Sequence, residues 1–221
     1  MPERTPGRTP GRTFVLASSS PSRLSILRSA GVEPSILVPG VDEDAAVADL
    51  HTRVASPTSA QVVCHLAQTK SQAVLTQYAD RLDPGSVVVA ADSMLLLDGE
   101  LQGKPLTAER TVQRWRQQRG RSATLVTGHA VTFLGAAGHE TVTGASETVV
   151  HFADASDRDI EAYAATGEPL QCAGAFTLEA LGGWFIDRIE GDPSSVIGLS
   201  LPLLRRTLAG FGLDVSEFWN R

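Results

Sequence analysis

The chain has 221 residues, 42% of them hydrophobic and 20% charged, which is the length and composition of a folded globular protein with a substantial core. A net charge of −6 argues against bulk electrostatic binding to nucleic acid, which requires clustered Lys and Arg, so we expect no nucleic-acid partner. With only two cysteines, no signal-peptide core and no apolar stretch near the ~20 residues of a membrane span, the sequence predicts a cytoplasmic protein without a membrane partner.

The N-terminal segment differs from the rest of the chain. It repeats Thr-Pro-Gly-Arg, first at Thr5 to Arg8 and then at Thr9 to Arg12, and offers no apolar side chain for a core. We therefore predict a disordered basic tail over residues 1–12. No internal repeat or linker follows it, so we predict a single domain over residues 13–221.

A buried strand over residues 14–17 is followed by three serines and a helix start. Ser20 suits the N-cap, Pro21 the first helical position, and Gly31 the end of that helix. Free backbone N–H groups at a helix N-terminus bind anions, phosphate above all, and Arg23 adds a guanidinium suited to phosphate oxygens. The alternative is that the serines only cap the helix.

The remaining segments predict a mixture of helices and strands. Helices are expected at 58–78, 107–120, 156–167 and 199–208, and strands at 87–91, 123–127, 130–134, 141–152 and 184–189. Helices and strands alternate in the first half of the chain, whereas neighbouring strands dominate the middle. This pattern favours an α/β fold with a mixed β-sheet flanked by helices, built as two lobes around a central cleft.

Asp92 ends the apolar run 87–91 and is the first candidate for chemistry. An Asp-Gly pair at 98–99 predicts a two-residue hairpin turn, which would pair Ser93 with Lys104 and return that lysine to the side of Asp92. Because strand side chains alternate between faces, the two share a site only if the ladder breaks. The glycine and proline that flank Lys104 favour such a break, and we expect it at or before Ser93.

These residues have both chemical and structural interpretations. A carboxylate at Asp92 can hold a divalent metal or accept a proton from water, or it can merely cap a turn. Lys104 can bind an anion or remain a surface charge. The Asp-Glu-Asp sequence at 42–44 is of metal-ligand type, although acidic loops are usually only solvated, and Lys70 lies on the predicted long helix, where a lysine usually faces outward.

Several large classes of site lack their sequence signals. The five histidines show no zinc spacing, and no paired Cys-x-x-Cys is present. A phosphate loop, a dinucleotide-binding fingerprint and a Gly-x-Ser-x-Gly nucleophile elbow are absent as well. These absences argue against a zinc enzyme and against three common enzyme families.

Several short motifs nevertheless stand in an order that resembles the Maf family of nucleoside triphosphate pyrophosphatases, and the resemblance covers nearly all of residues 13–208. The motifs are Leu-Ala-Ser-Ser-Ser-Pro-Ser-Arg at 16–23, Val-Asp-Glu at 41–43, Lys70, Ala-Asp-Ser at 91–93, Gly-Lys-Pro at 103–105, Thr-Gly at 127–128, Ala-Gly-Ala-Phe at 173–176, Gly-Asp at 191–192 and Val-Ile-Gly-Leu at 196–199.

The resemblance implies a fold similar to inosine triphosphate pyrophosphatases, with the nucleotide in the cleft. It implies hydrolysis between the α and β phosphates to a nucleoside monophosphate and pyrophosphate, assisted by Mg²⁺ or Mn²⁺, and homodimers are common in the family. The matching positions are Asp92 as catalytic proton acceptor, Glu43 and Asp92 near the metal, and Ser18, Ser20, Arg23, Lys70 and Lys104 on the triphosphate. Because family members are associated with septum formation, the alternative function is a non-catalytic, nucleotide-binding regulator of cell division.

Three positions depart from the family's patterns. Ser22 stands where a basic residue or tryptophan is common, Ser93 where the pyrimidine-preferring branch has Thr, and Glu179 where that branch has Gln. A glutamate only accepts hydrogen bonds, which suits the N1–H and amino group of guanine. We therefore predict a guanine or 7-methylguanine base, bound in a pocket that the small Ser22 leaves loose.

Overall fold

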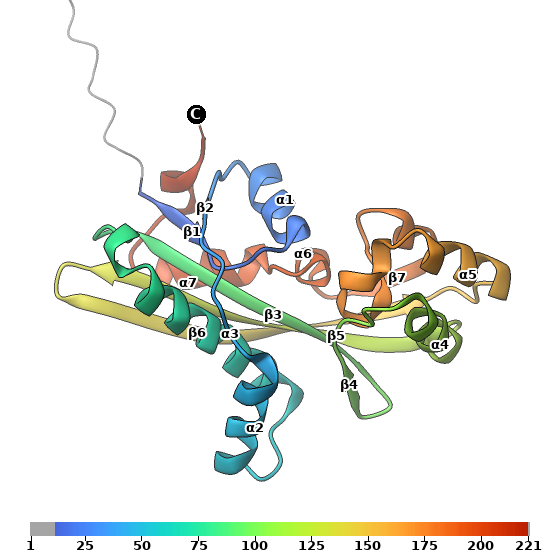
Figure 1. The fold of residues 1–221 in the computed structure, drawn as a ribbon. Helices are drawn as coiled ribbons and strands as arrows, with labels where there is room; N and C mark the ends of the chain where they lie inside the picture. Colours follow the sequence, from blue (N-terminus) through green and yellow to red (C-terminus); the bar gives the residue numbers. More distant parts are fainter. Residues whose placement is uncertain (1–11, 221) are drawn as a thin grey trace, which may run out of the picture.

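The structure is a computed structural model that describes residues 12–220, so the predicted tail lies, apart from Arg12, outside the described residues. One seven-stranded mixed sheet runs through it in the order β2-β1-β3-β5-β6-β7, and β4 pairs with β3 (Figure 1). Its strands are β1 (Phe14–Leu16), β2 (Ser35–Ile36), β3 (Val87–Leu97), β4 (Glu100–Gln102), β5 (Ser122–Gly135), β6 (Gly138–Phe152) and β7 (Ile186–Glu190).

Helices cover both faces of this sheet (Figure 1). The α-helices are α1 (Pro21–Ser29), α2 (Glu43–Arg53), α3 (Ser59–Gln77), α4 (Ala108–Gln118), α5 (Asp157–Ala165), α6 (Pro193–Ile197) and α7 (Leu201–Gly210). Short 3₁₀ segments are η1 (Ala79–Arg81), η2 (Glu168–Gln171), η3 (Ala173–Ala175), η4 (Leu181–Phe185) and η5 (Val215–Phe218). The predicted α/β class with a mixed sheet is confirmed.

The long strand β3 contributes to two separate cores on one face of the sheet. Val87 and Val89 pack with α1 and α7 at one end, whereas Leu95 and Leu97 pack with α4 and α5 at the other. The second core centres on the fully buried Trp115, whose ring meets three aromatic rings edge-on and whose Nε1 donates to the Ala175 carbonyl at 2.7 Å. The two cores form the two predicted lobes.

Helix α3 lies on the opposite face and packs against the alternate residues of β3. Val88 and Ala90 are fully buried there, together with Val74 of the helix. The helix begins where the sequence predicts, because Thr58 and Gln61 form a capping box.

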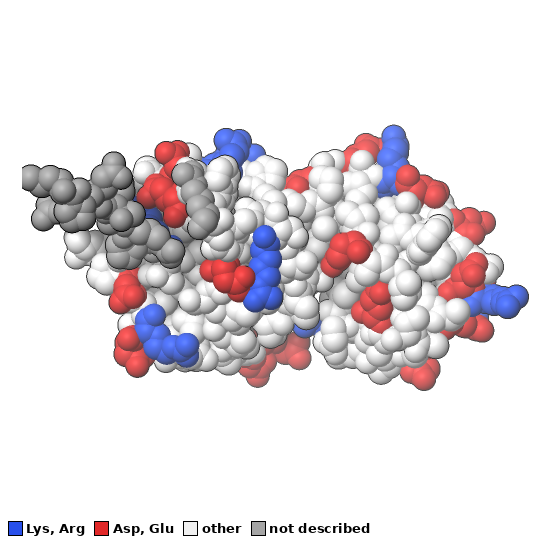
Figure 2. Space-filling view, turned by 90° about the horizontal axis from the view of Figure 1, so that it is seen from above, with Lys and Arg blue, Asp and Glu red and all other residues white. Residues whose placement is uncertain are grey.

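Seen from above, the Lys and Arg side chains on the displayed face of the molecule are scattered among acidic ones (Figure 2).

Two boundaries in the second half were predicted wrongly. The expected separate strands at 123–127 and 130–134 are one continuous strand, β5, with Gly128 inside it. That glycine accommodates α3 rather than a turn, since a Cβ atom there would lie 2.3 Å from the carbonyl carbon of Val63. The expected strand at 184–189 starts only at Ile186, because η4 occupies the residues before it.

Two further differences concern helices near the site. The acidic residues 42–44 do not form a loop: Asp42 caps α2, and Glu43 and Asp44 fill its first turn, where negative charge complements the helix dipole. The predicted helix at 199–208 is shifted, because Ser200 caps α7, and the short helix α6 precedes it.

We expect Gly128→Ala to destabilise the protein by about 3 kcal/mol, because the new methyl group would overlap the backbone of α3. Gly210→Ala is the matched control, since nothing lies within 4 Å of a Cβ atom at that position. Thermal unfolding followed by circular dichroism measures both variants. Equal melting temperatures for the two would contradict the close approach of α3 to β5.

Candidate active site

The site is built on an interruption at one edge of β3. On that edge β1 pairs with β3 up to Val89, and β4 pairs with it from Leu95 onward. Between them, Asp92 and Ser93 have a strand neighbour only on the other side, in β5. Both residues line the cleft described below.

The predicted hairpin is present, but its ladder is short. Glu100 pairs with Leu97, and the pairing ends at Leu95 and Gln102. The break before Ser93 is confirmed, whereas the pairing of Ser93 with Lys104 is wrong. The two-residue turn sets the register, but Gly103 and Pro105 are unfavourable in a strand interior, so the returning strand ends at Gln102.

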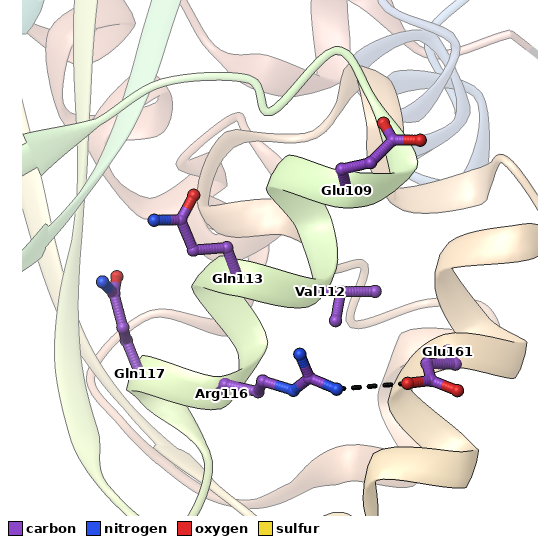
Figure 3. Close-up of a pocket in the computed structure, with 6 residues that line it drawn as sticks. All are labelled: Glu109, Val112, Gln113, Arg116, Gln117 and Glu161. Carbon is purple, nitrogen blue, oxygen red and sulfur yellow. Dashed lines mark hydrogen bonds and ion pairs between the residues drawn. The ribbon is translucent and has the colours of Figure 1, made fainter.

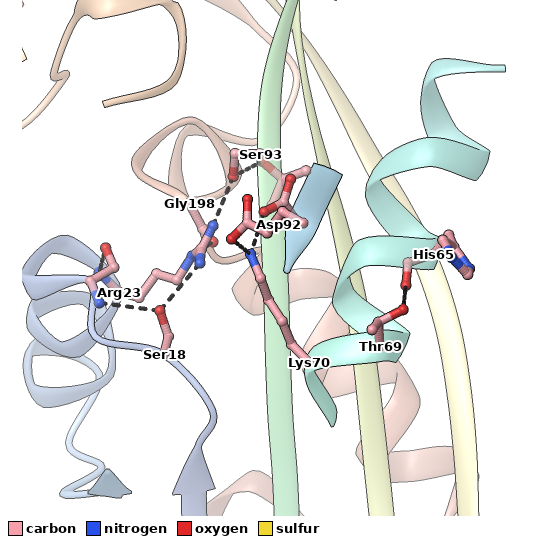
Figure 4. Close-up of polar contacts among 11 residues, drawn as sticks. Ser18, Arg23, His65, Thr69, Lys70, Asp92, Ser93 and Gly198 are labelled. Atoms are coloured by element: carbon pink, nitrogen blue, oxygen red, sulfur yellow. Dashed lines mark hydrogen bonds and ion pairs between the residues drawn. The ribbon is translucent and has the colours of Figure 1, made fainter. Parts of the chain in front are cut away.

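Lys70 of α3 is the direct partner of Asp92. Its Nζ lies 2.6 Å from Asp92 Oδ1 and 2.8 Å from Glu43 Oε1, so one ammonium group joins two carboxylates from different elements (Figure 4). The side chains of Lys70 and Asp92 are only 12% and 10% exposed. The alternative of an outward-facing lysine is therefore excluded, because Lys70 points into the cleft and contacts Asp92 of β3.

Glu43 experiences three cationic side chains. Burial by itself would raise the pKa of Glu43, but the hydrogen bond and charge of Lys70 and the charges of Lys104 and Arg23 together lower it. Glu43 is thus held in its ionised form. Its half-exposed carboxylate is the part of this cluster that faces solvent most.

Arg23 is fixed by three acceptors from three parts of the chain. Its guanidinium donates to the Gly198 carbonyl at 2.9 Å, to Ser18 Oγ at 3.3 Å and to Ser93 Oγ at 3.3 Å (Figure 4). Burial lowers the pKa of Arg23, which the charges of Asp92 and Glu43 partly offset. These three contacts use three of the five N–H donors of the guanidinium group. Because the group is planar, they also fix the directions in which its two remaining N–H bonds point.

The predicted helix start is confirmed at the same place. Ser20 caps α1 by accepting from the Arg23 N–H at 3.4 Å, and Ser18 Oγ accepts from the Ser20 N–H at 3.1 Å. Behind Ser93, the Thr127 hydroxyl donates to the Ser195 carbonyl at 2.8 Å and lies 2.9 Å from Ser93 Oγ. Ser93 therefore donates to Thr127 and accepts from Arg23.

All predicted site residues line one cleft of about 530 Å³ between the two lobes. They are Ser18, Ser20, Ser22, Arg23, Glu43, Lys70, Asp92, Ser93, Lys104 and Glu179. The serines and Arg23 come from the lobe of α1, whereas Glu179 follows Phe176 and Thr177 in the lobe of α4 and α5. The cleft thus joins a charged region to a region that contains an aromatic ring.

Two contributions to the cleft were not predicted. The Gly198 carbonyl, which holds Arg23, lies at the end of α6, where Gly198 has a φ of 120°. Glu168 also lines the cleft, directly after Gly167, which has a φ of 79°. The Val-Ile-Gly-Leu motif at 196–199 includes Gly198 but gave it no role, and the signal before Glu168 was a glycine that ends a helix, which marks a turn without identifying a site.

A second hollow lies between α4 and α5 (Figure 3). Its lining includes Arg116 and Glu161, whose side chains approach to 3.1 Å, together with Val112 and two glutamines. None of the predicted site residues lines it. The chemistry that the sequence predicts is confined to the cleft between the lobes.

The cleft offers a metal two carboxylates. Within residues 12–220 no group of three or more His, Cys, Asp and Glu side chains is arranged for a metal ion. Asp92 and Glu43, however, already converge on one cation, the ammonium group of Lys70. Mg²⁺ is commonly bound through one or two carboxylates, with substrate phosphates and water as its other ligands, so this donor set fits such an ion.

No helix in the described part of the chain is both long and apolar enough to span a bilayer. Cys64 and Cys172 are free and partly buried.

Comparison with known proteins gives one consistent family. The family model described as "Maf-like protein" matches residues 13–211. A nucleoside triphosphate pyrophosphatase of Corynebacterium efficiens is 62% identical over 208 residues, 94% of this chain and 99% of that protein. A protein of the same name from Corynebacterium aurimucosum is 64% identical over 93% of this chain and 98% of its own length. Another from Rhodococcus opacus is 56% identical over 94% of this chain and 96% of its own length. Among solved structures, the Staphylococcus aureus Ham1 protein matches with a TM-score of 0.38 at 17% identity, covering 65% of this chain and 73% of that one.

We expect Lys70→Met to lower the free energy of unfolding by about 2 kcal/mol, because it leaves the nearly buried Asp92 carboxylate without its cation. Adding Asp92→Asn should recover most of this loss, so the two changes couple strongly. Urea unfolding of the four proteins at neutral pH measures the coupling. The exposed pair Arg28 and Glu33 is the control, with coupling close to zero expected. Additive effects at Lys70 and Asp92 would contradict the assigned contact.

Proposed function

Because this chain belongs to the family of Maf-like proteins, we propose that it is a nucleoside triphosphate pyrophosphatase, which cleaves the bond between the α and β phosphates and releases a nucleoside monophosphate and pyrophosphate. The observation that carries the proposal is the cleft in which Asp92, Lys70 and Arg23 meet, since it combines a carboxylate with cations suited to phosphate. Hydrolysis of an anhydride needs mainly positioning and neutralisation of charge, which these residues supply.

We assign the proton-accepting role to Asp92. Lys70 holds its Oδ1 atom at 2.6 Å, which orients the carboxylate and leaves Oδ2 for the attacking water. A general base has to lie within hydrogen-bond reach of the proton that it takes, and Asp92 lines the cleft into which substrate and water would enter. Lys70 is thereby both an orienting group and a positive charge beside the reacting phosphate.

We assign the triphosphate to the region around the N-terminus of α1. Ser18, Ser20 and the first turn of the helix present hydroxyl and N–H groups there, and Arg23 contributes the guanidinium donors that Gly198, Ser18 and Ser93 leave free. Lys104 lines the same cleft and is exposed, so it is available to a phosphate that enters. The small Ser22 leaves space beside this helix turn.

We propose Mg²⁺ or Mn²⁺ as the cofactor, held by Asp92 and Glu43 together with phosphate oxygens of the substrate. The support for it is the pair of carboxylates that already share one cation in Lys70. When bound, such an ion supplies positive charge to the phosphate oxygens and lowers the pKa of a bound water. The lowered pKa of Glu43 keeps its carboxylate ionised for this role.

We propose that Glu179 recognises the nucleobase. It lines the cleft on the lobe opposite to α1, and its carboxylate is exposed. A carboxylate only accepts hydrogen bonds, so it matches the N1–H and amino donors of a guanine better than the mixed edge of uracil. A guanine or 7-methylguanine nucleotide is therefore the proposed substrate class.

We also propose a cytoplasmic location, with which the two free cysteines agree, and the homodimer stays a prediction.

With Mg²⁺ present, we expect the protein to release pyrophosphate from a nucleoside triphosphate, and Asp92→Asn to lower the rate at least about 100-fold by removing the base. Asp80→Asn, an exposed change on η1, should leave the rate unchanged. A pyrophosphate-coupled assay measures all three proteins, and EDTA in place of Mg²⁺ should abolish release. A wild-type rate in Asp92→Asn would remove the catalytic assignment, and tight nucleotide binding without turnover in the wild type would support the regulator of cell division instead.

Replacing Glu179 by Gln should move base preference from guanine toward uracil. The amide offers one donor and one acceptor, so we expect the ratio of kcat/KM for GTP to that for UTP to fall about tenfold. Glu140→Gln, an exposed change on β6, is the control. If the wild-type enzyme already prefers uridine or thymidine triphosphate, the assignment of Glu179 to guanine is wrong.

A further inference from the structure

The Glu168 carboxylate forms more hydrogen bonds than its position on a surface turn requires. It follows α5 in η2 and lines the cleft. Its Oε1 atom accepts from the Tyr163 hydroxyl at 3.1 Å, from the Gly182 N–H at 3.0 Å and from the Thr177 hydroxyl, and its Oε2 atom accepts from the Leu181 N–H at 3.2 Å. These four donors use up most of the acceptor capacity of one carboxylate.

Three of the four donors belong to one loop, residues 177–182. The two ends of the loop also contact each other, since the Gly182 N–H lies 3.2 Å from the Thr177 hydroxyl. The Thr177 N–H donates to the Tyr163 hydroxyl of α5 at 3.2 Å. A Cβ atom at Gly182 would lie 2.5 Å from the Thr177 carbonyl and from the Tyr163 hydroxyl. The loop is therefore wound tightly around Glu168 and admits little rearrangement.

The electrostatics agree with an ionised Glu168. Burial would raise the pKa of Glu168, but the Thr177 hydroxyl and the Gly182 and Leu181 N–H groups outweigh it, and the net direction is downward. Burial and the neighbouring carboxylate together raise the pKa of Tyr163, so the phenol stays a donor. Among the ion pairs of the described residues, none involves Glu168, so its charge is stabilised by neutral donors alone.

The anchored loop carries Glu179. This residue stands between the two points that Glu168 holds, Thr177 on one side and Leu181 on the other. Its own Oε2 atom accepts from the Leu178 N–H at 3.1 Å, which turns the side chain back along the loop. The orientation of the Glu179 carboxylate in the cleft thus depends on how the loop is held.

We propose that Glu168 is a positioning residue for base recognition: it fixes the loop 177–182 so that Glu179 is presented to the nucleobase, without itself contributing to binding of the triphosphate. This inference rests on the proposed function. It separates the two halves of substrate recognition, because Ser18, Ser20 and Arg23 lie on the lobe of α1 and share none of the hydrogen bonds of Glu168.

The test compares a ligand that has a base with one that has none. Isothermal titration calorimetry with Mg²⁺ measures binding of GTP and of inorganic tripolyphosphate to the Asp92→Asn protein, which prevents turnover. In that background we expect Glu168→Ala to weaken GTP binding about tenfold, the effect of losing about 1.4 kcal/mol, and to change tripolyphosphate binding by less than about twofold.

Two further variants control the result. Tyr163→Phe removes one donor to Glu168 from a residue outside the lining of the cleft, so it should weaken GTP binding selectively and by less than Glu168→Ala. Glu161→Gln lies on the outer surface of the same helix α5 and should change neither ligand. If Glu168→Ala does not fold, as judged by circular dichroism, Tyr163→Phe decides the question.

The outcomes are distinguishable. Equal weakening of both ligands would assign Glu168 a general structural role and overturn the inference, as would unchanged GTP binding. Equal affinity of the Asp92→Asn parent for GTP and tripolyphosphate would also overturn it, because no base contact would then exist to be positioned. A wild-type protein that neither binds GTP nor releases pyrophosphate from it would count against the proposed function itself.

Discussion

The interrupted edge of β3 is the constraint on which the rest of the site depends. β1 ends before Asp92 and Ser93 and β4 starts after them, so on this side no strand pairs with β3 at these residues, and both line the cleft. Side chains from the helices reach them from the two faces of the sheet. Because successive side chains of a strand point to opposite faces of the sheet, Asp92 contacts Lys70 of α3, whereas Ser93 contacts Arg23 of α1.

The opened edge gathers charges of both signs in one place. A carboxylate as little exposed as Asp92 needs a cation, and Lys70 provides it while also binding Glu43. Arg23 is buried at a cost, which three acceptors and the nearby carboxylates offset. Asp92, Glu43, Lys70 and Arg23 already have partners within the protein. An incoming triphosphate therefore has to replace some of these partners, and because the side chains are held in fixed orientations, one mode of binding is favoured.

The sequence predicted the local features of this arrangement better than the distant ones. The cap at Ser20, the start of α3 and the break in the hairpin follow from residues close together in the chain. The partner of Asp92 could not be found in that way, because hydrophobic periodicity identifies the buried stripe of α3 but does not say that Lys70 at its margin contacts Asp92 of β3. Gly128 was misinterpreted for the same reason, since a close approach of α3 and a turn have the same sequence signal.

The same strands that carry the charged region also fix the second lobe. β3 and β5 pass through both cores without a break, and Trp115 packs the second core tightly against them. Asp92 lies on β3 between the part of the strand that packs in the first core and the part that packs in the second. If Glu179 recognises the base, as proposed, its selectivity depends on the direction in which the loop holds its carboxylate.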